Sequence, residues 1–175
     1  MTVQTKTKLK RYAVYGVIIL LAHIFQNILT IFPEIASVRP VLLISVALCI
    51  AMFEGEVVGA VAGLLSGALW DTFTVTADGY NALYLMVACA VCGVLLRIFM
   101  RNNIITYIMM NTGFTTLYFL SYVLFFITAR GVDGGAEMLL RYYLPMGIYS
   151  LVLTPFWYVI IRAINRKFSY SYTEY

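Results

Sequence analysis

Six long apolar stretches, separated by short polar turns, organise the chain. They are Tyr12–Ile31, Pro40–Phe53, Val57–Trp70, Tyr80–Leu96, Ile104–Thr128 and Tyr143–Ile161. Charged residues gather in clusters between these stretches, as they do in polytopic membrane proteins. The pattern predicts an all-α polytopic membrane protein, a compact bundle of six transmembrane segments in one domain over residues 1–175. Residues 1–11 would be a cytoplasmic N-terminus, residues 12–161 would form the bundle, and residues 162–175 would be a cytoplasmic tail. The polar stretch Asn165–Tyr175 of that tail is expected to be mobile.

The second and third stretches are short for transmembrane helices. Each has 14 residues, which corresponds to about 21 Å of helix against a hydrocarbon core of about 30 Å. They could extend through flanking residues, thin the bilayer locally, or form a re-entrant hairpin. All three alternatives stay open at this point.

Basic residues predict the orientation. With six crossings, nine Lys and Arg residues fall on the side of the termini and three fall on the other side. Merging the second and third stretches into one span makes the two sides equal, at six each. Because cytoplasmic loops carry an excess of Lys and Arg, we expect both termini in the cytoplasm and the two short stretches as separate segments.

Composition removes several classes of protein. The chain is 62% hydrophobic and 11% charged, with a mean hydropathy of +0.88, so a soluble domain of this size could not bury its apolar surface. The net charge of +4 comes from residues at segment ends and forms no basic stripe for nucleic acid. The apolar run after the charged N-terminus lacks a small-residue cleavage site, which favours a retained first span over a signal peptide.

Cysteine and acid placement argues against catalysis. Cys49, Cys89 and Cys92 lie inside apolar runs, where an extracytoplasmic disulfide framework is not expected. The pair Cys89–Cys92 has no neighbouring histidine, so zinc or thioredoxin-like chemistry is not expected either. No catalytic triad, metal-ligand cluster or phosphate-binding loop is present, and the eight acids fall mostly at turns. We therefore expect no enzyme, no metal and no cofactor.

A ladder of glycines marks the third stretch. Gly55, Gly59, Gly63 and Gly67 are four residues apart, and the next step of four reaches Asp71. Each step turns a helix by about 400°, so the glycines form an oblique groove that lets another helix approach at about −40°. Two interpretations remain. The groove packs against a helix of the same chain, or it receives the helix of a partner or of a second copy.

Acids at the two ends of this stretch need separate interpretations. Asp71 opposes the dipole of its own helix and directly follows Trp70, an interfacial residue type. We expect it to have a structural role, paired with Arg39, Arg130 or a foreign cation. Glu54 and Glu56 lie at the turn before the glycines and are expected to be solvated.

Two polar patches interrupt the apolar segments. His23, Gln26 and Asn27 share one face of the first segment, and Asn111, Thr112, Thr115 and Thr116 form a patch on the fifth. Polar groups in lipid must find hydrogen-bond partners, so interhelical hydrogen bonds are the main interpretation. A substrate or proton path is the alternative. Pro155 is expected to kink the sixth segment, and Glu137–Arg141 is expected to form a short interfacial helix with an i,i+4 ion pair.

The order of these motifs resembles the bacterial rod shape-determining MreD family. The resemblance is carried by "RPVLLISVALCIAMFEGEVVGAVAGLLSGALWD", which combines a Pro-led apolar run, a turn with acids and Gly, and a helix of the form GxxxGxxxGxxxD. It continues in "DGYNALYLMVACAVCGVLLR" and in the length, segment number and Pro-containing last segment. Val41 departs from the family, which often has an acid after the Pro, so that acid's role does not carry over.

The resemblance implies a non-enzymatic component of the cell-wall elongation machinery in the bacterial cytoplasmic membrane. Members of the family bind the bitopic protein MreC. Through it they associate with MreB filaments, the RodA glycosyltransferase and a class B penicillin-binding protein. A second MreD copy and membrane lipids are further expected partners. The family fold is similar to the substrate-binding subunits of ECF transporters, so a small-molecule-binding subunit is the alternative function, with His23, Gln26, Asn27, Asn111 and Thr115 as its polar residues.

Overall fold

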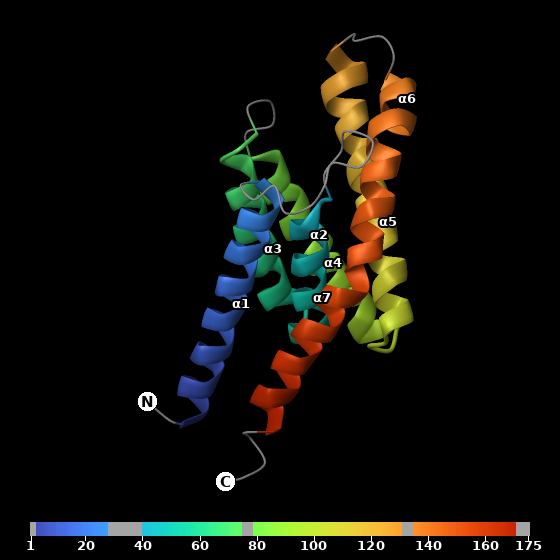
Figure 1. Ribbon diagram of the computed structural model, residues 1–175. Coiled ribbons are helices and arrows are strands. Elements are labelled where there is room, and N and C mark those ends of the chain that lie inside the picture. Colours follow the sequence, from blue (N-terminus) through green and yellow to red (C-terminus); the bar gives the residue numbers. More distant parts are fainter. Residues whose placement is uncertain (1–2, 28–39, 75–78, 131–134, 171–175) are drawn as a thin grey trace.

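The computed structural model describes residues 3–27, 40–74, 79–130 and 135–170, and these residues are helical apart from short turns. The α-helices are α1 (Val3–Asn27), α2 (Leu42–Glu54), α3 (Glu56–Asp71), α4 (Tyr80–Ile98), α5 (Ile104–Tyr122), α6 (Gly135–Met138) and α7 (Leu144–Tyr170). Two π-helical turns, Val123–Ile127 and Leu139–Tyr143, and a 3₁₀ turn, Thr128–Arg130, extend them. Figure 1 shows the long helices side by side in one bundle.

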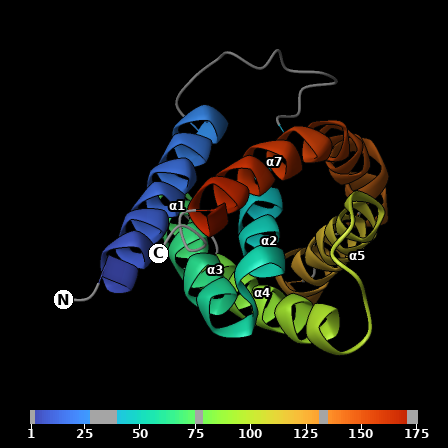
Figure 2. The same ribbon diagram turned by 90° about the horizontal axis from the view of Figure 1, so that it is seen from below.

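The short helix α2 lies at the centre of the bundle. Figure 2 shows it surrounded by α1, α3, α4, α5 and α7, and it packs against all five. Its sequence LLISVALCIAMFE has no polar face, and residues 42–52 are all buried. A helix that is apolar all round avoids water best when protein or lipid surrounds it completely. Here the surrounding is protein, so the roughly 20 Å length of α2 does not have to match the lipid core.

Among the residues that the structure describes, four helical stretches are long and apolar enough to cross a membrane. They are Thr7–Asn27, Tyr80–Ile98, Ile104–Ile127 and Leu140–Phe168. The sequence predicted six segments, and the structure agrees on a helical membrane protein but gives only these four that length. The remaining two, α2 and α3, are joined through Gly55, whose φ of +86° suits glycine, and they run antiparallel in Figure 1.

The last helix extends beyond the predicted segment. A mobile stretch was expected from Asn165, but α7 continues to Tyr170. That prediction is wrong for residues 165–170. Pro155 lies inside α7, and the ribbon changes direction between its orange and red parts in Figure 1, as expected where a ring replaces a backbone N–H. The predicted pair in the 137–141 segment is present, with Arg141 Nη1 3.9 Å from Glu137 Oε1.

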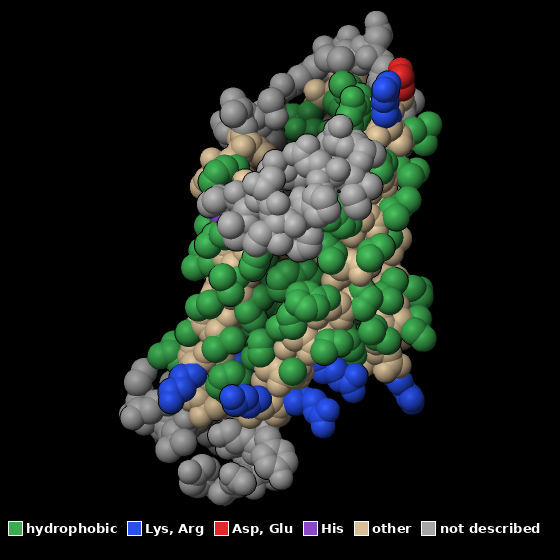
Figure 3. Space-filling view, in the orientation of Figure 1, with side chains coloured by type: hydrophobic (Ala, Val, Ile, Leu, Met, Phe, Trp, Pro, Cys, Tyr) green, Lys and Arg blue, Asp and Glu red, His purple; other side chains and the backbone are tan. Residues whose placement is uncertain are grey.

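The two ends of the bundle differ in charge. In Figure 1, α1 begins and α7 ends at the same end. Figure 3 shows Lys and Arg side chains gathered at that end, which we call the basic end, below a broad apolar side surface. Large apolar side chains are exposed along that surface, including Val152 (70% exposed) and Leu83 (63%). A continuous exposed apolar surface of this size is typical of contact with lipid.

Candidate functional site

The glycine face of α3 is occupied by this chain itself. A Cβ at Gly63 or Gly67 would lie under 3.0 Å from the backbone of α4, at Leu85 or at Asn81 and Ala82. At Gly59 it would lie 2.5 Å from the Cβ of Ala51 in α2. The interpretation of these glycines as a docking groove for a partner helix or second copy is therefore wrong. The interpretation as internal packing is the one that the structure supports.

Two glycines at the basic end have roles that the sequence did not predict. Gly55 was assigned to the groove, but a Cβ there would meet nothing within 4 Å, and the residue instead makes the turn. Gly93, on α4, was missed. A Cβ on Gly93 would lie 2.5 Å from the backbone nitrogen of Glu56, so α4 also contributes a glycine to the close approach of the two helices. Gly93 is a single glycine near the end of its apolar stretch, so no repeated spacing marked it in the sequence.

Asp71 caps the start of α4. Its Oδ2 accepts a hydrogen bond from the backbone N–H of Ala82 at 3.0 Å, and its Oδ1 accepts one from the N–H of Asn81 at 3.3 Å. The first N–H groups of a helix lack intrahelical partners and carry partial positive charge, so a carboxylate stabilises them. Asp71 has the expected structural role, but its observed partners are backbone amides. Arg39 and the side chain of Arg130 lie outside the described residues.

Removing this cap should weaken the α3–α4 pair. We expect Asp71→Ala to lower the free energy of unfolding by about 0.5–2 kcal/mol, the range for loss of a helix N-cap. Glu137→Ala is the control, because that carboxylate is 78% exposed in an i,i+4 pair and such pairs contribute little. Denaturation in detergent–SDS mixtures followed by circular dichroism measures both. Equal effects of the two substitutions would contradict the cap.

A side chain on the polar face of α1 accepts hydrogen bonds from the start of α2. Gln26 Oε1 accepts hydrogen bonds from the backbone N–H groups of Leu42 at 2.8 Å and Leu43 at 3.1 Å. Val41, the residue before α2, has no side-chain acceptor of its own. His23 and Asn27 bond to each other, with Asn27 Nδ2 3.1 Å from His23 Nδ1. The interhelical interpretation therefore holds for Gln26, while His23 and Asn27 bond within α1.

The polar patch on α5 connects that helix to α7. Asn111 Nδ2 donates to Thr154 Oγ1 at 2.8 Å. Asn111 Oδ1 and Thr115 Oγ1 are buried and have no hydrogen-bond partner within the part of the chain that the structure describes. In the same described part, no hydrogen bond joins this patch to the patch on α1. The two polar patches thus do not form one site.

A lipid-facing groove opens beside this α5 patch, and we call it the threonine groove. Its volume is about 200 Å³, and its lining includes Thr112, Thr115, Thr116, Gly147 and Ile148. Thr116 lies twelve residues into α5, about 18 Å from the helix start, which places the groove near the middle of a lipid core. Hydroxyls at that depth need protein partners because lipid offers none.

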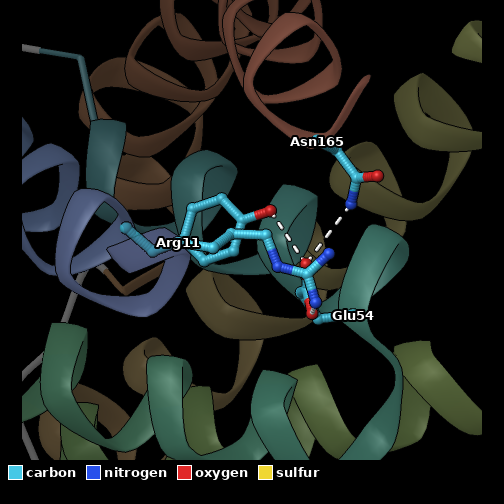
Figure 4. A network of polar contacts seen from close by, with 4 residues as sticks. Arg11, Glu54 and Asn165 are labelled. Atoms are coloured by element: carbon cyan, nitrogen blue, oxygen red, sulfur yellow. Dashed lines mark hydrogen bonds and ion pairs between the residues drawn. The ribbon is translucent and has the colours of Figure 1, made fainter. Parts of the chain in front are cut away.

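A buried ion-pair network at the basic end was missed by the sequence analysis. Glu54 was expected to be solvated, but its side chain is 4% exposed and its Oε2 lies 2.7 Å from Arg11 Nη2. Tyr15 Oη donates to Glu54 Oε1 at 2.9 Å, and Asn165 Nδ2 donates to the same oxygen at 3.3 Å. Figure 4 shows these side chains converging from α1, α2 and α7. The sequence did contain a signal for this pair. Arg11 directly precedes the first apolar stretch and Glu54 directly follows the second, which places both at the same end of the bundle.

Glu56 differs from Glu54 although only Gly55 separates them. Its Oε1 accepts a hydrogen bond from Arg97 Nη1 at 2.6 Å, and the two side chains are 31% and 73% exposed. The pKa of Glu56 lies below its usual value, first because its carboxylate accepts a backbone hydrogen bond and then because of Arg97. Glu56 therefore agrees with the prediction of a solvated acid, whereas Glu54 does not.

Cysteine and metal chemistry adds no further site within the described residues. Cys49, Cys89 and Cys92 are buried free thiols, and no group of three His, Cys, Asp or Glu side chains there could hold a metal ion. The candidate surfaces are thus the threonine groove and the apolar exterior. In comparisons with known proteins, no family model, no curated protein and no solved structure matches the chain.

Proposed function

We propose that the chain is a non-enzymatic scaffold of the bacterial cell-wall elongation complex, located in the cytoplasmic membrane with six segments and both termini inside. In this role it binds MreC and, through it, connects MreB filaments to RodA and a class B penicillin-binding protein. The MreD-like order of motifs between residues 39 and 97 supports the proposal. That order includes the glycine spacing, which the fold uses to join α3 to α4.

One structural observation carries the choice of a scaffold over an enzyme. The acids of α2 and α3 are engaged in contacts with other helices: Glu54 with Arg11, Glu56 with Arg97, and Asp71 with the first amides of α4. A general acid or base must reach a substrate proton. These carboxylates face other parts of the protein instead.

The partner helix is proposed to dock in the threonine groove. The glycine face of α3 is covered by α4, so it presents no surface to a partner. The threonine groove faces lipid, and Gly147 and the small threonine side chains allow a helix to approach closely. A hydrogen-bonding side chain on that helix would satisfy the buried hydroxyl of Thr115, which has no partner in the described part of the chain.

Two substitutions test the threonine groove. Thr115→Val removes the unpartnered hydroxyl and keeps the shape, so we expect it to weaken MreC binding about threefold to tenfold, the range for an interhelical hydrogen bond. Thr116→Leu should weaken binding further by filling the groove. Gly113→Leu is the control, because this α5 position is exposed, outside the groove, and open around its Cβ. Co-purification of tagged MreC with each variant provides the measurement.

The outcomes separate three cases. Unchanged MreC recovery with both threonine variants, at normal levels of the folded protein, would contradict this docking surface. Loss of self-association without loss of MreC would assign the groove to a second copy. An equal loss with Gly113→Leu would show that any added bulk on α5 interferes, and the groove would not be specific.

Depletion in a rod-shaped host tests the function itself. If the chain maintains the elongation complex, depleted cells should become round, and expression of the wild-type protein should restore rods. Phase-contrast microscopy of cell length and width measures the effect. Unchanged cell shape after verified depletion would contradict the scaffold proposal.

Small-molecule binding is the second candidate, and unsatisfied polar atoms favour it. Ser45 Oγ, Asn111 Oδ1 and Thr115 Oγ1 are buried without hydrogen-bond partners in the described residues. Gln26, which was proposed to bind a ligand, instead holds the start of α2. Mass spectrometry of the purified protein decides between the candidates, because a transporter-type subunit should carry a stoichiometric metabolite.

A further inference from the structure

A crevice between α1 and α3 opens at the basic end of the bundle. Its volume is about 280 Å³, and its walls are built by Tyr12, Gly16 and Ile19 of α1 and by Val57, Val61 and Leu65 of α3. Ile50 of the central helix forms its floor. A Cβ placed at Gly16 would meet nothing within 4 Å, so the space beside α1 is open. The crevice is almost entirely apolar and faces the lipid side of the bundle.

The crevice is closed toward the opposite end. His23 lies one turn beyond Ile19 on the same face of α1, and its ring packs edge-on against Phe73 with centroids 5.0 Å apart. The crevice therefore runs from Val57 to Leu65, eight residues or about 12 Å, and then ends. One leaflet contributes about half of a 30 Å hydrocarbon core. A transmembrane helix needs a groove through the whole core, whereas an acyl chain from one leaflet needs only this length.

Positive charge surrounds the open mouth. Lys8 lies one turn before Tyr12 on the same face of α1 and is exposed. Figure 3 shows further Lys and Arg side chains around this end. The two acids described here, Glu54 and Glu56, are each paired with an arginine. The net charge at the mouth is therefore positive and complements the phosphate of an anionic lipid.

We propose that the α1–α3 crevice binds an anionic phospholipid of the leaflet at the basic end, with an acyl chain in the crevice and the phosphate at Lys8. The acyl chain would fill the space between α1 and α3. It would thereby stabilise α1 against the rest of the bundle. This inference does not depend on the scaffold function, and its test uses the purified chain alone.

Lipid retention by the purified full-length protein tests the proposal. The protein is exchanged into micelles that contain equal amounts of dioleoyl phosphatidylglycerol and dioleoyl phosphatidylcholine, and native mass spectrometry measures the retained lipids. The wild type should retain phosphatidylglycerol preferentially. Lys8→Gln should reduce this preference about fivefold, the contribution of one basic residue near an anionic surface. Gly16→Leu should fill the crevice and abolish retention of either lipid.

Matched controls lie on the same kinds of helix surface. Lys10→Gln removes an exposed charge from the other side of α1, and Gly113→Leu adds the same bulk to an open position on α5. Both should behave as the wild type. If Gly16→Leu does not fold, Val61→Trp fills the crevice from α3, because Val61 is 53% exposed.

Two results would overturn the proposal. The first is equal retention of the two lipids by the wild type. The second is wild-type retention of phosphatidylglycerol by a folded crevice-filling variant. The depletion experiment tests only the scaffold function. Its outcome, round or rod-shaped cells, does not affect the lipid result.

Discussion

Glu54→Leu is expected to lower the free energy of unfolding by about 3–5 kcal/mol, the cost of breaking a buried ion pair by removing one partner. The side chains of Glu54 and Arg11 are 4% and 14% exposed. Without Glu54, the charge of Arg11 would therefore stay buried, with little water to solvate it. Tyr15 also loses its acceptor. Because the network joins α1, α2 and α7, this loss should affect the whole bundle, and SDS-induced unfolding monitored by circular dichroism measures it.

The exposed ion pair of the same protein provides the control for Glu54. Arg97→Gln removes the partner of Glu56, and Arg97 is 73% exposed, so we expect little change in stability. The double variant Arg11→Met/Glu54→Leu should recover most of the lost stability, because replacing both buried charges with apolar groups is often neutral. A Glu54→Leu effect no larger than that of Arg97→Gln would show that the network does not hold the bundle together.

Gly63→Ala is expected to lower the free energy of unfolding by about 3 kcal/mol, the upper end of the usual cost of overpacking. The added methyl group would lie under 3.0 Å from backbone atoms of Leu85. Backbone cannot move away as a flexible side chain can, so α3 and α4 would have to separate. Gly67→Ala should act in the same way against Asn81 and Ala82.

The same substitution at Gly113 should have the opposite sign. A Cβ at Gly113 meets nothing within 4 Å, and alanine is the better helix former by about 1 kcal/mol. The same SDS titration measures both variants. If Gly63→Ala and Gly113→Ala change stability equally, close packing of α3 on α4 does not contribute to stability. The prediction also means that larger residues at Gly59 or Gly63 would disrupt the fold itself, so they cannot test partner binding.

Much of the helical organisation was predictable because it depends on local composition. The start of α4 at Tyr80 and of α5 at Ile104 agree with the predicted segments, since an apolar run between polar turns is visible in the sequence alone. The extension of α7 to Tyr170 was not predicted, because a polar helix that continues beyond the apolar segment has no hydropathy signal. The hydropathy pattern also could not decide whether the short α2 and α3 cross the membrane fully.

The candidate site was less predictable, because its features join residues that are distant in the sequence. The sequence predicts a solvated turn acid at Glu54, but α1 and α7 cover it, and its partner Arg11 lies 43 positions away. Asp71 was expected to meet a cation, but it meets amides of the next helix, ten and eleven residues later. The sequence predicts Thr115 as part of a polar patch, but only the structure leaves its hydroxyl without a partner in the described residues.

The sequence by itself determined that this is a helical membrane protein, where its apolar helical segments lie, and that one of them needs a close neighbour. These properties follow from single residues and their spacing: apolar side chains favour lipid or protein over water, and glycine lacks a Cβ. Only the tertiary structure decided that α4 is that neighbour, that α2 is enclosed by five helices, and that Glu54 is buried. Those outcomes depend on which surfaces meet when all the helices pack together, and no single segment contains that information.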